Sequence, residues 1–140
     1  MNLINLQNLL AADEVLVFRI QDIETGQGPS ENSKKWGPIA RHVDGRVWCN
    51  EEPCDDPAIK DKYSVSGYRF GTTEYEQLRR WFGSAYRQLE AAGYGVFVFI
   101  AKKEDVCEGR AQAVFNREKA REVAWFNCCD SVERLSAFHN

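Results

Sequence analysis

Hydrophobic positions along the chain form short runs rich in β-branched and aromatic residues, and this composition predicts β-strands. The clearest runs cover residues 15–20 and 96–101. The second run is apolar at every position, as expected for a strand that is buried on both faces in the centre of a sheet. Weaker runs at residues 63–70, 111–115 and 121–127 predict further strands.

One segment has helical rather than strand spacing, because its apolar residues recur at intervals of three and four. Thr73 and Glu76 have the spacing of a capping box, and Gly93 fits the C-terminal cap. These signals predict a long helix over about 73–92, which Gly83 could split because glycine disfavours a helix interior. The apolar positions of this helix are Tyr75, Leu78, Phe82, Ala85, Leu89 and Ala92.

The order of these elements indicates the fold class. Asp130 and Glu133 repeat the capping spacing and predict a short C-terminal helix. A strand, a long loop, a strand, a helix, several strands and a last helix are typical of an α+β fold with a mainly antiparallel sheet. We expect residues 1–140 to form a single compact domain.

Residues 29–62 interrupt the pattern and predict an irregular insertion rich in proline and tryptophan. Asp44-Gly45 favours a hairpin turn inside it. Long connections of this kind in compact domains are often functional or disordered. The insertion contains all four prolines, which are Pro29, Pro38, Pro53 and Pro57, and two of the four tryptophans, which are Trp36 and Trp48.

Composition sets broad limits on the class of protein. The 140 residues are 44% hydrophobic and 12% aromatic, which indicates a globular domain rather than a disordered chain. With 18 basic and 21 acidic residues the net charge is −3, which argues against binding to duplex nucleic acid. No signal peptide is evident and no apolar run could span a bilayer, so we expect a cytoplasmic protein that does not bind membranes.

The five cysteines cannot all pair within the chain because their number is odd. Four thiolates could bind zinc, but the spacing of Cys49 and Cys54 is at the edge of the usual range. The adjacent Cys128 and Cys129 are poorly placed to act together as ligands. We therefore predict free cysteines and no metal site.

The insertion gathers the side chains that we predict to contact a partner. Aromatic and arginine side chains in a loop can anchor a protein interface or stack on a base, although they can equally form a small core beneath the loop. The acidic residues either meet a basic partner or form a solvated loop. The predicted contact residues are Trp36, Arg41, Arg46, Trp48, Glu51, Glu52, Asp55 and Asp56.

Several segments resemble a group of small uncharacterised phage and prophage proteins. These segments are Val17–Asp22, Gly26–Pro29, 71–82 and 112–115, and the resemblance touches most of the chain. It implies an accessory protein of a phage or mobile element, acting on host machinery in the host cytoplasm.

The same landmarks resemble a reduced ADP-ribosyltransferase domain, which implies an enzyme that uses NAD. Arg19 matches the basic residue on that family's early strand, and Thr72 matches the end of a later strand. Gln112 stands where the family has its catalytic Glu, and an uncharged amide cannot act as a base. Glu108 lies close but off the expected spacing.

Three functions follow from these observations. The first is a non-catalytic protein without cofactor that binds and blocks a host protein or complex, as an anti-defence or anti-CRISPR-like inhibitor does. The second is an ADP-ribosyltransferase with candidate catalytic residues Arg19, Thr72, Glu108 and Gln112. The third is a sponge that sequesters a nucleotide signal in the same cleft. We favour the binder because the common catalytic motifs are absent from the sequence.

Overall fold

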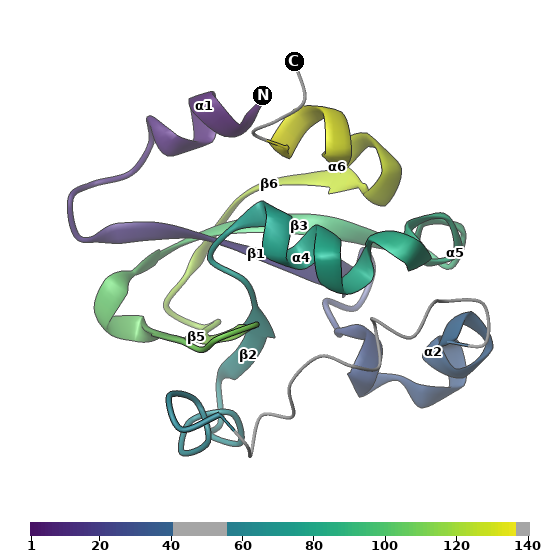
Figure 1. Ribbon diagram of the computed structural model, residues 1–140, viewed down its shortest axis with the longest axis horizontal. Coiled ribbons are helices and arrows are strands. Elements are labelled where there is room, and N and C mark those ends of the chain that lie inside the picture. Colours follow the sequence, from purple (N-terminus) through teal and green to yellow (C-terminus); the bar gives the residue numbers. More distant parts are fainter. Residues whose placement is uncertain (41–55, 137–140) are drawn as a thin grey trace.

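The computed structural model describes residues 1–40 and 56–136, which fold into a single α+β domain (Figure 1). The α+β prediction is confirmed. The elements in chain order are α1 (Leu3–Gln7), β1 (Glu14–Asp22), η1 (Pro29–Glu31), α2 (Ser33–Ala40), β2 (Tyr68–Gly71), α4 (Tyr75–Phe82), η3 (Gly83–Ala85), α5 (Tyr86–Ala91), β3 (Tyr94–Lys102), η4 (Lys103–Asp105), β4 (Val106–Glu108), β5 (Ala113–Asn116), β6 (Arg121–Asn127) and α6 (Cys128–Leu135).

The larger sheet has the order β1-β3-β6 and is antiparallel throughout. β3 is the central strand, as its uninterrupted apolar run predicts. In Figure 1, α4 and α5 lie across this sheet, and α6 lies near α1. Phe18 and Val98 are paired across β1 and β3, and both belong to the main core together with Leu78 of α4.

The smaller sheet has the order β2-β5-β4 and packs on the other face of β1 and β3. A second cluster, with Val17, Phe99 and Phe115 at its centre, fills the space between the sheets. A single β-bridge between Phe18 and Thr72 links β1 to the end of β2. Gly71 permits this close approach, because a β-carbon there would lie 2.8 Å from a backbone carbonyl oxygen of β1.

The long helix begins later than predicted, but it is interrupted at the predicted glycine. It begins at Tyr75 after Glu74 as N-cap, since the Thr73 hydroxyl instead donates to a carboxylate oxygen of Glu108. At Gly83 it passes through η3 before continuing as α5, so the expected break is confirmed. Gly93 follows α5 with φ of 91°, as the C-terminal cap prediction requires.

Other boundaries also differ from the predictions. The strand predicted over 63–70 begins only at Tyr68, because the residues before it form turns. The last helix begins at Cys128, so Asp130 lies in its first turn and is not the N-cap. Residues 29–40, predicted to be irregular, form η1 and α2. The predicted turn at Asp44-Gly45 lies outside the described residues.

Candidate functional site

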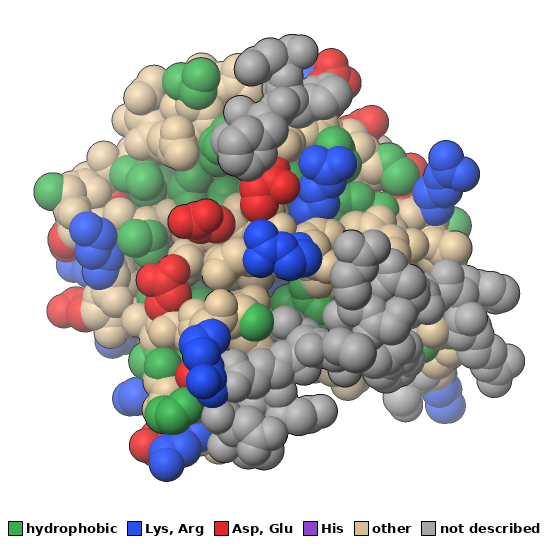
Figure 2. Space-filling model, in the orientation of Figure 1, with side chains coloured by type: hydrophobic (Ala, Val, Ile, Leu, Met, Phe, Trp, Pro, Cys, Tyr) green, Lys and Arg blue, Asp and Glu red, His purple; other side chains and the backbone are tan. Residues whose placement is uncertain are grey.

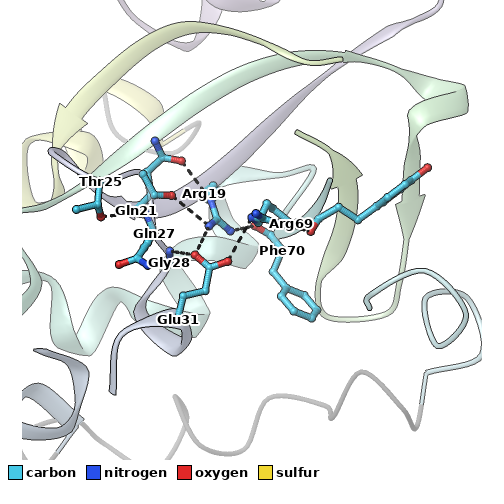
Figure 3. Close-up of polar contacts among 10 residues, drawn as sticks. Arg19, Gln21, Thr25, Gln27, Gly28, Glu31, Arg69 and Phe70 are labelled. Atoms are coloured by element: carbon cyan, nitrogen blue, oxygen red, sulfur yellow. Dashed lines mark hydrogen bonds and ion pairs between the residues drawn. The ribbon is translucent and has the colours of Figure 1, made fainter. Parts of the chain in front are cut away.

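Arg19 is a charged residue inside the domain and lies on the face of β1 that looks toward the smaller sheet. Its side chain is 5% exposed, and three of its nitrogens have acceptors (Figure 3). Nε donates to Gln21 Oε1 at 3.2 Å, and Nη1 donates to the Phe70 carbonyl oxygen at 2.9 Å. Nη2 lies 3.3 Å from Glu31 Oε2. Through these contacts the Arg19 side chain connects β1 with η1 and β2.

Glu31 is the counter-ion of this cluster. Its Oε2 also accepts the backbone N–H of Gly28 at 2.6 Å, while Oε1 lies 3.3 Å from Arg69 Nε. A β-carbon on Gly28 would lie 3.1 Å from Arg19 Nη2, so glycine lets the loop close over the guanidinium. Burial lowers the pKa of Arg19 to about 10 against the opposing effect of Glu31, and the group remains charged at neutral pH.

A second polar group lies at the end of β1. Asp22 Oδ1 accepts hydrogen bonds from the backbone N–H groups of Glu24 and Thr25, and Oδ2 accepts a hydrogen bond from Lys35 Nζ. Burial raises the pKa of Asp22, but the hydrogen bonds from Lys35 and from the two backbone amides outweigh it, so the pKa is lowered. Lys35 Nζ also lies 4.8 Å from the centre of the Tyr94 ring. The buried Tyr94 hydroxyl has no hydrogen-bond partner among the described residues.

Three of the four candidate catalytic residues are buried in the structure. Thr72 lies opposite Phe18, next to Arg19, and extending the β2–β5 register places Gln112 beside Thr72. The backbones are therefore close, but Arg19, Thr72 and Gln112 are only 4%, 0% and 3% exposed. The Thr72 hydroxyl donates to the Glu74 carbonyl oxygen. Glu108 is exposed and accepts the Thr73 hydroxyl.

Two of the predicted contact residues are among those described. Trp36 is half-buried and meets Phe82 edge to face, with ring centroids 6.2 Å apart. Asp56 is 2% exposed, and its carboxylate accepts the backbone N–H groups of Ala58 and Arg110. Both side chains therefore make contacts within the domain. The other predicted contact residues, which are Arg41, Arg46, Trp48, Glu51, Glu52 and Asp55, lie outside the described residues.

Comparison with known proteins gives the family of the chain. A family model described as Bacteriophage T4 Y00F protein matches residues 10–129. The chain belongs to this family. The match confirms the phage resemblance, and it gives no support to the resemblance to ADP-ribosyltransferases. Neither curated proteins nor solved structures give a significant match to this Y00F-family protein.

Trp125 is the most exposed aromatic side chain among the described residues of the Y00F-family protein, and the sequence pattern indicates no more for it than a place in a strand. Its side chain is 46% exposed and stacks on Phe97, with centroids 5.8 Å apart and planes 17° apart. Phe97 is 4% exposed, so the indole rests on a fixed support. A groove of about 410 Å³ begins beside it, lined by Met1, Trp125, Phe126, Asn127, Asp130, Glu133 and Arg134.

The described cysteines of the Y00F-family protein, which are Cys107, Cys128 and Cys129, are free in the structure. Cys128 is buried, and burial raises its pKa to about 12, so it stays a thiol. Among residues 1–40 and 56–136 no group of three or more metal-ligating side chains occurs. Cys49 and Cys54 lie outside these residues. No described helix has the length and apolarity to cross a membrane.

Charge is evenly mixed on the face that carries α4. Acidic and basic side chains are interspersed there with apolar ones over the described part of the Y00F-family protein (Figure 2). The described residues on this face therefore form no basic cluster of the kind that nucleic-acid interfaces have.

Proposed function

We propose that this Y00F-family protein is a non-catalytic binder, with which a phage engages and blocks a host protein. The single observation that supports this most is the exposed indole of Trp125, held flat on the buried Phe97. Tryptophan is enriched among the residues that dominate the binding energy of interfaces. A supported ring loses little conformational freedom on binding, which favours affinity.

The alternative function, an ADP-ribosyltransferase that uses NAD, would require existing hydrogen bonds of Arg19 to be broken. A ligand phosphate would have to reach the guanidinium of Arg19, whose donors already serve Gln21, Phe70 and Glu31. Displacing Glu31 would also leave the Gly28 amide without its acceptor. Arg19 therefore serves the fold in this proposal, and the binder needs no cofactor.

The test is affinity capture from a lysate of the host bacterium with the purified, tagged protein. We expect a stoichiometric partner that is retained by the wild type and lost by Trp125→Ala. Val65→Ala is the matched control, since Val65 is 41% exposed and lies outside the sheets. Circular dichroism should show that both variants remain folded.

Two results would count against this function. If the Trp125→Ala variant retained the same partner, the indole of Trp125 would not be part of the interface. Calorimetric binding of NAD, together with transfer of a labelled ADP-ribose group to a lysate protein, would favour the enzyme instead.

A further inference from the structure

The outer edge of β6 has no strand paired with it in the described part of the chain. β6 pairs with β3 on one side, and no backbone hydrogen bond joins its other side to any described residue. Its register with β3 shifts at Val123, which leaves Ala124–Asn127 as a regular stretch. Alternate residues of such an edge direct their N–H and C=O groups into solvent, where another strand can pair with them.

Devices that protect a sheet edge are confined to one end of β6. Charged side chains and a bulge normally discourage pairing. Here Arg121, Glu122 and the irregularity at Val123 all precede the regular stretch, and Ala124–Asn127 contains no charge. The unprotected part of the edge also carries the exposed Trp125.

We propose that β6 pairs antiparallel with β6 of a second copy of this chain, centred on Trp125. This pairing joins two three-stranded sheets into one sheet of six strands. The two-fold axis stands perpendicular to the sheet, so both indoles lie on the same face as a cross-strand pair. Aromatic cross-strand pairs stabilise antiparallel strands.

The charges at the two ends of β6 suit this arrangement. Arg121 precedes Trp125 by four residues, and Asp130 follows it by five in the first turn of α6. Antiparallel pairing brings Arg121 of each copy to the groove of the other, where Asp130 and Glu133 lie. Arg134 in the same groove offers an opposite charge to Glu122.

The intrachain contact of Arg121 is compatible with this role. Its Nη1 lies 3.2 Å from Glu14 Oε2, yet its side chain is 58% exposed. An exposed ion pair of this kind contributes little, so the Arg121 side chain can leave Glu14 and turn to a carboxylate of the second copy.

The experiment is sedimentation equilibrium of the full chain over a wide concentration range. Wild type should approach twice the chain mass of 16.0 kDa. Arg121→Glu and Asp130→Arg should each weaken the dimer about tenfold or more, since each change acts twice across the two-fold axis. The double variant R121E/D130R exchanges the charges and should restore the dimer. Arg80→Glu, at an exposed position of α4, is the matched charge reversal outside β6.

Hydrogen exchange followed by NMR adds a test of the backbone. Amides at alternate positions of Ala124–Asn127 should become protected as the concentration of wild type rises. A monomer at all concentrations would overturn the proposal. So would a dimer that is insensitive to R121E and leaves these amides unprotected.

The dimer is independent of host binding. Both indoles remain on one face, so the dimer doubles the surface proposed for the host partner. Failure of self-association with intact Trp125-dependent capture would refute only the dimer, whereas a dimer without capture would refute only the proposed function.

Discussion

Removing the counter-ion of the buried arginine tests how the three elements of the cluster are held together. In Glu31→Ala the guanidinium of Arg19 loses its carboxylate, and the amide of Gly28 loses its acceptor. Arg19 stays buried beneath β2 because its bonds to Gln21 and Phe70 remain. The variant therefore leaves a buried charge without an ionic partner, which is the costly way to break such a pair.

The expected magnitude follows from the hydrogen bonds that the Glu31 carboxylate accepts. A hydrogen bond to a charged group contributes about 1.5–3 kcal/mol. The Glu31 side chain is 34% exposed, so water can replace part of what is removed. We expect Glu31→Ala to lower the free energy of unfolding by about 2–3 kcal/mol. Arg69→Gln should cost only about 0.5 kcal/mol, because its ion pair with Glu31 is exposed on the arginine side.

Urea unfolding at pH 7, followed by circular dichroism, measures both values, and the m-values should stay constant. The double variant R19M/E31A completes a cycle, in which we expect a coupling energy of about 1–2 kcal/mol. A Glu31→Ala variant no less stable than Arg69→Gln would refute the reasoning. A coupling energy near zero would do the same, since it would mean that Arg19 does not depend on Glu31.

Three further predictions concern stability. Tyr94→Phe removes a buried hydroxyl that has no hydrogen-bond partner among the described residues. Urea titration should show a free energy of unfolding that is about 1 kcal/mol higher than that of wild type. A clearly lower free energy of unfolding would show that the hydroxyl is hydrogen-bonded. Gly71→Ala places a methyl group 2.8 Å from the backbone of β1 and should lower the free energy of unfolding by about 2–3 kcal/mol. Gly37 has open space around it, so Gly37→Ala should be neutral or stabilising. Equal effects of the two variants would contradict the close approach at Gly71. Asp22 has a lowered pKa, so its ionised form stabilises the fold above the unfolded value of about 3.9, and this stabilisation is lost as the pH falls through the lower folded value. The deficit of Asp22→Asn relative to wild type should therefore be about 1–2 kcal/mol at pH 7, from the lost charged hydrogen bond with Lys35, and should shrink as the pH falls through the lowered folded pKa. A deficit independent of pH would rule out the ion pair with Lys35 as its source.

Local pattern was sufficient for the elements that the sequence predicts well. β1, β3 and β6 are apolar runs, and the segment from α4 to α5 has a helical face, so neighbours in the chain already carry the signal. The sequence does not predict α2, because Pro38 lies inside it and proline favours a loop. The three-residue β4 lies in a polar segment, where periodicity cannot be measured.

The polar cluster could not be predicted because its contacts are distant along the chain. The sequence indicates Arg19 as a catalytic candidate, yet two of its acceptors lie 12 and 51 residues away, at Glu31 and Phe70. Nothing near Arg19 in the sequence indicates burial. The pattern places Trp125 only in a strand, and its exposure and its stacking on Phe97 are seen only in the structure.

The pairing of β1 with β3 has a consequence for folding. Even the closest pair in this register, Asp22 and Tyr94, joins residues that are 72 positions apart (94 − 22). Folding rates fall as contacting residues become more distant along the chain, so this pairing is expected to be a late and slow step. During synthesis β1 emerges from the ribosome before β3. Until β3 is made, β1 has no strand to pair with and its apolar side chains remain exposed. The newly made chain is then most open to aggregation or to capture by chaperones until β3 has emerged.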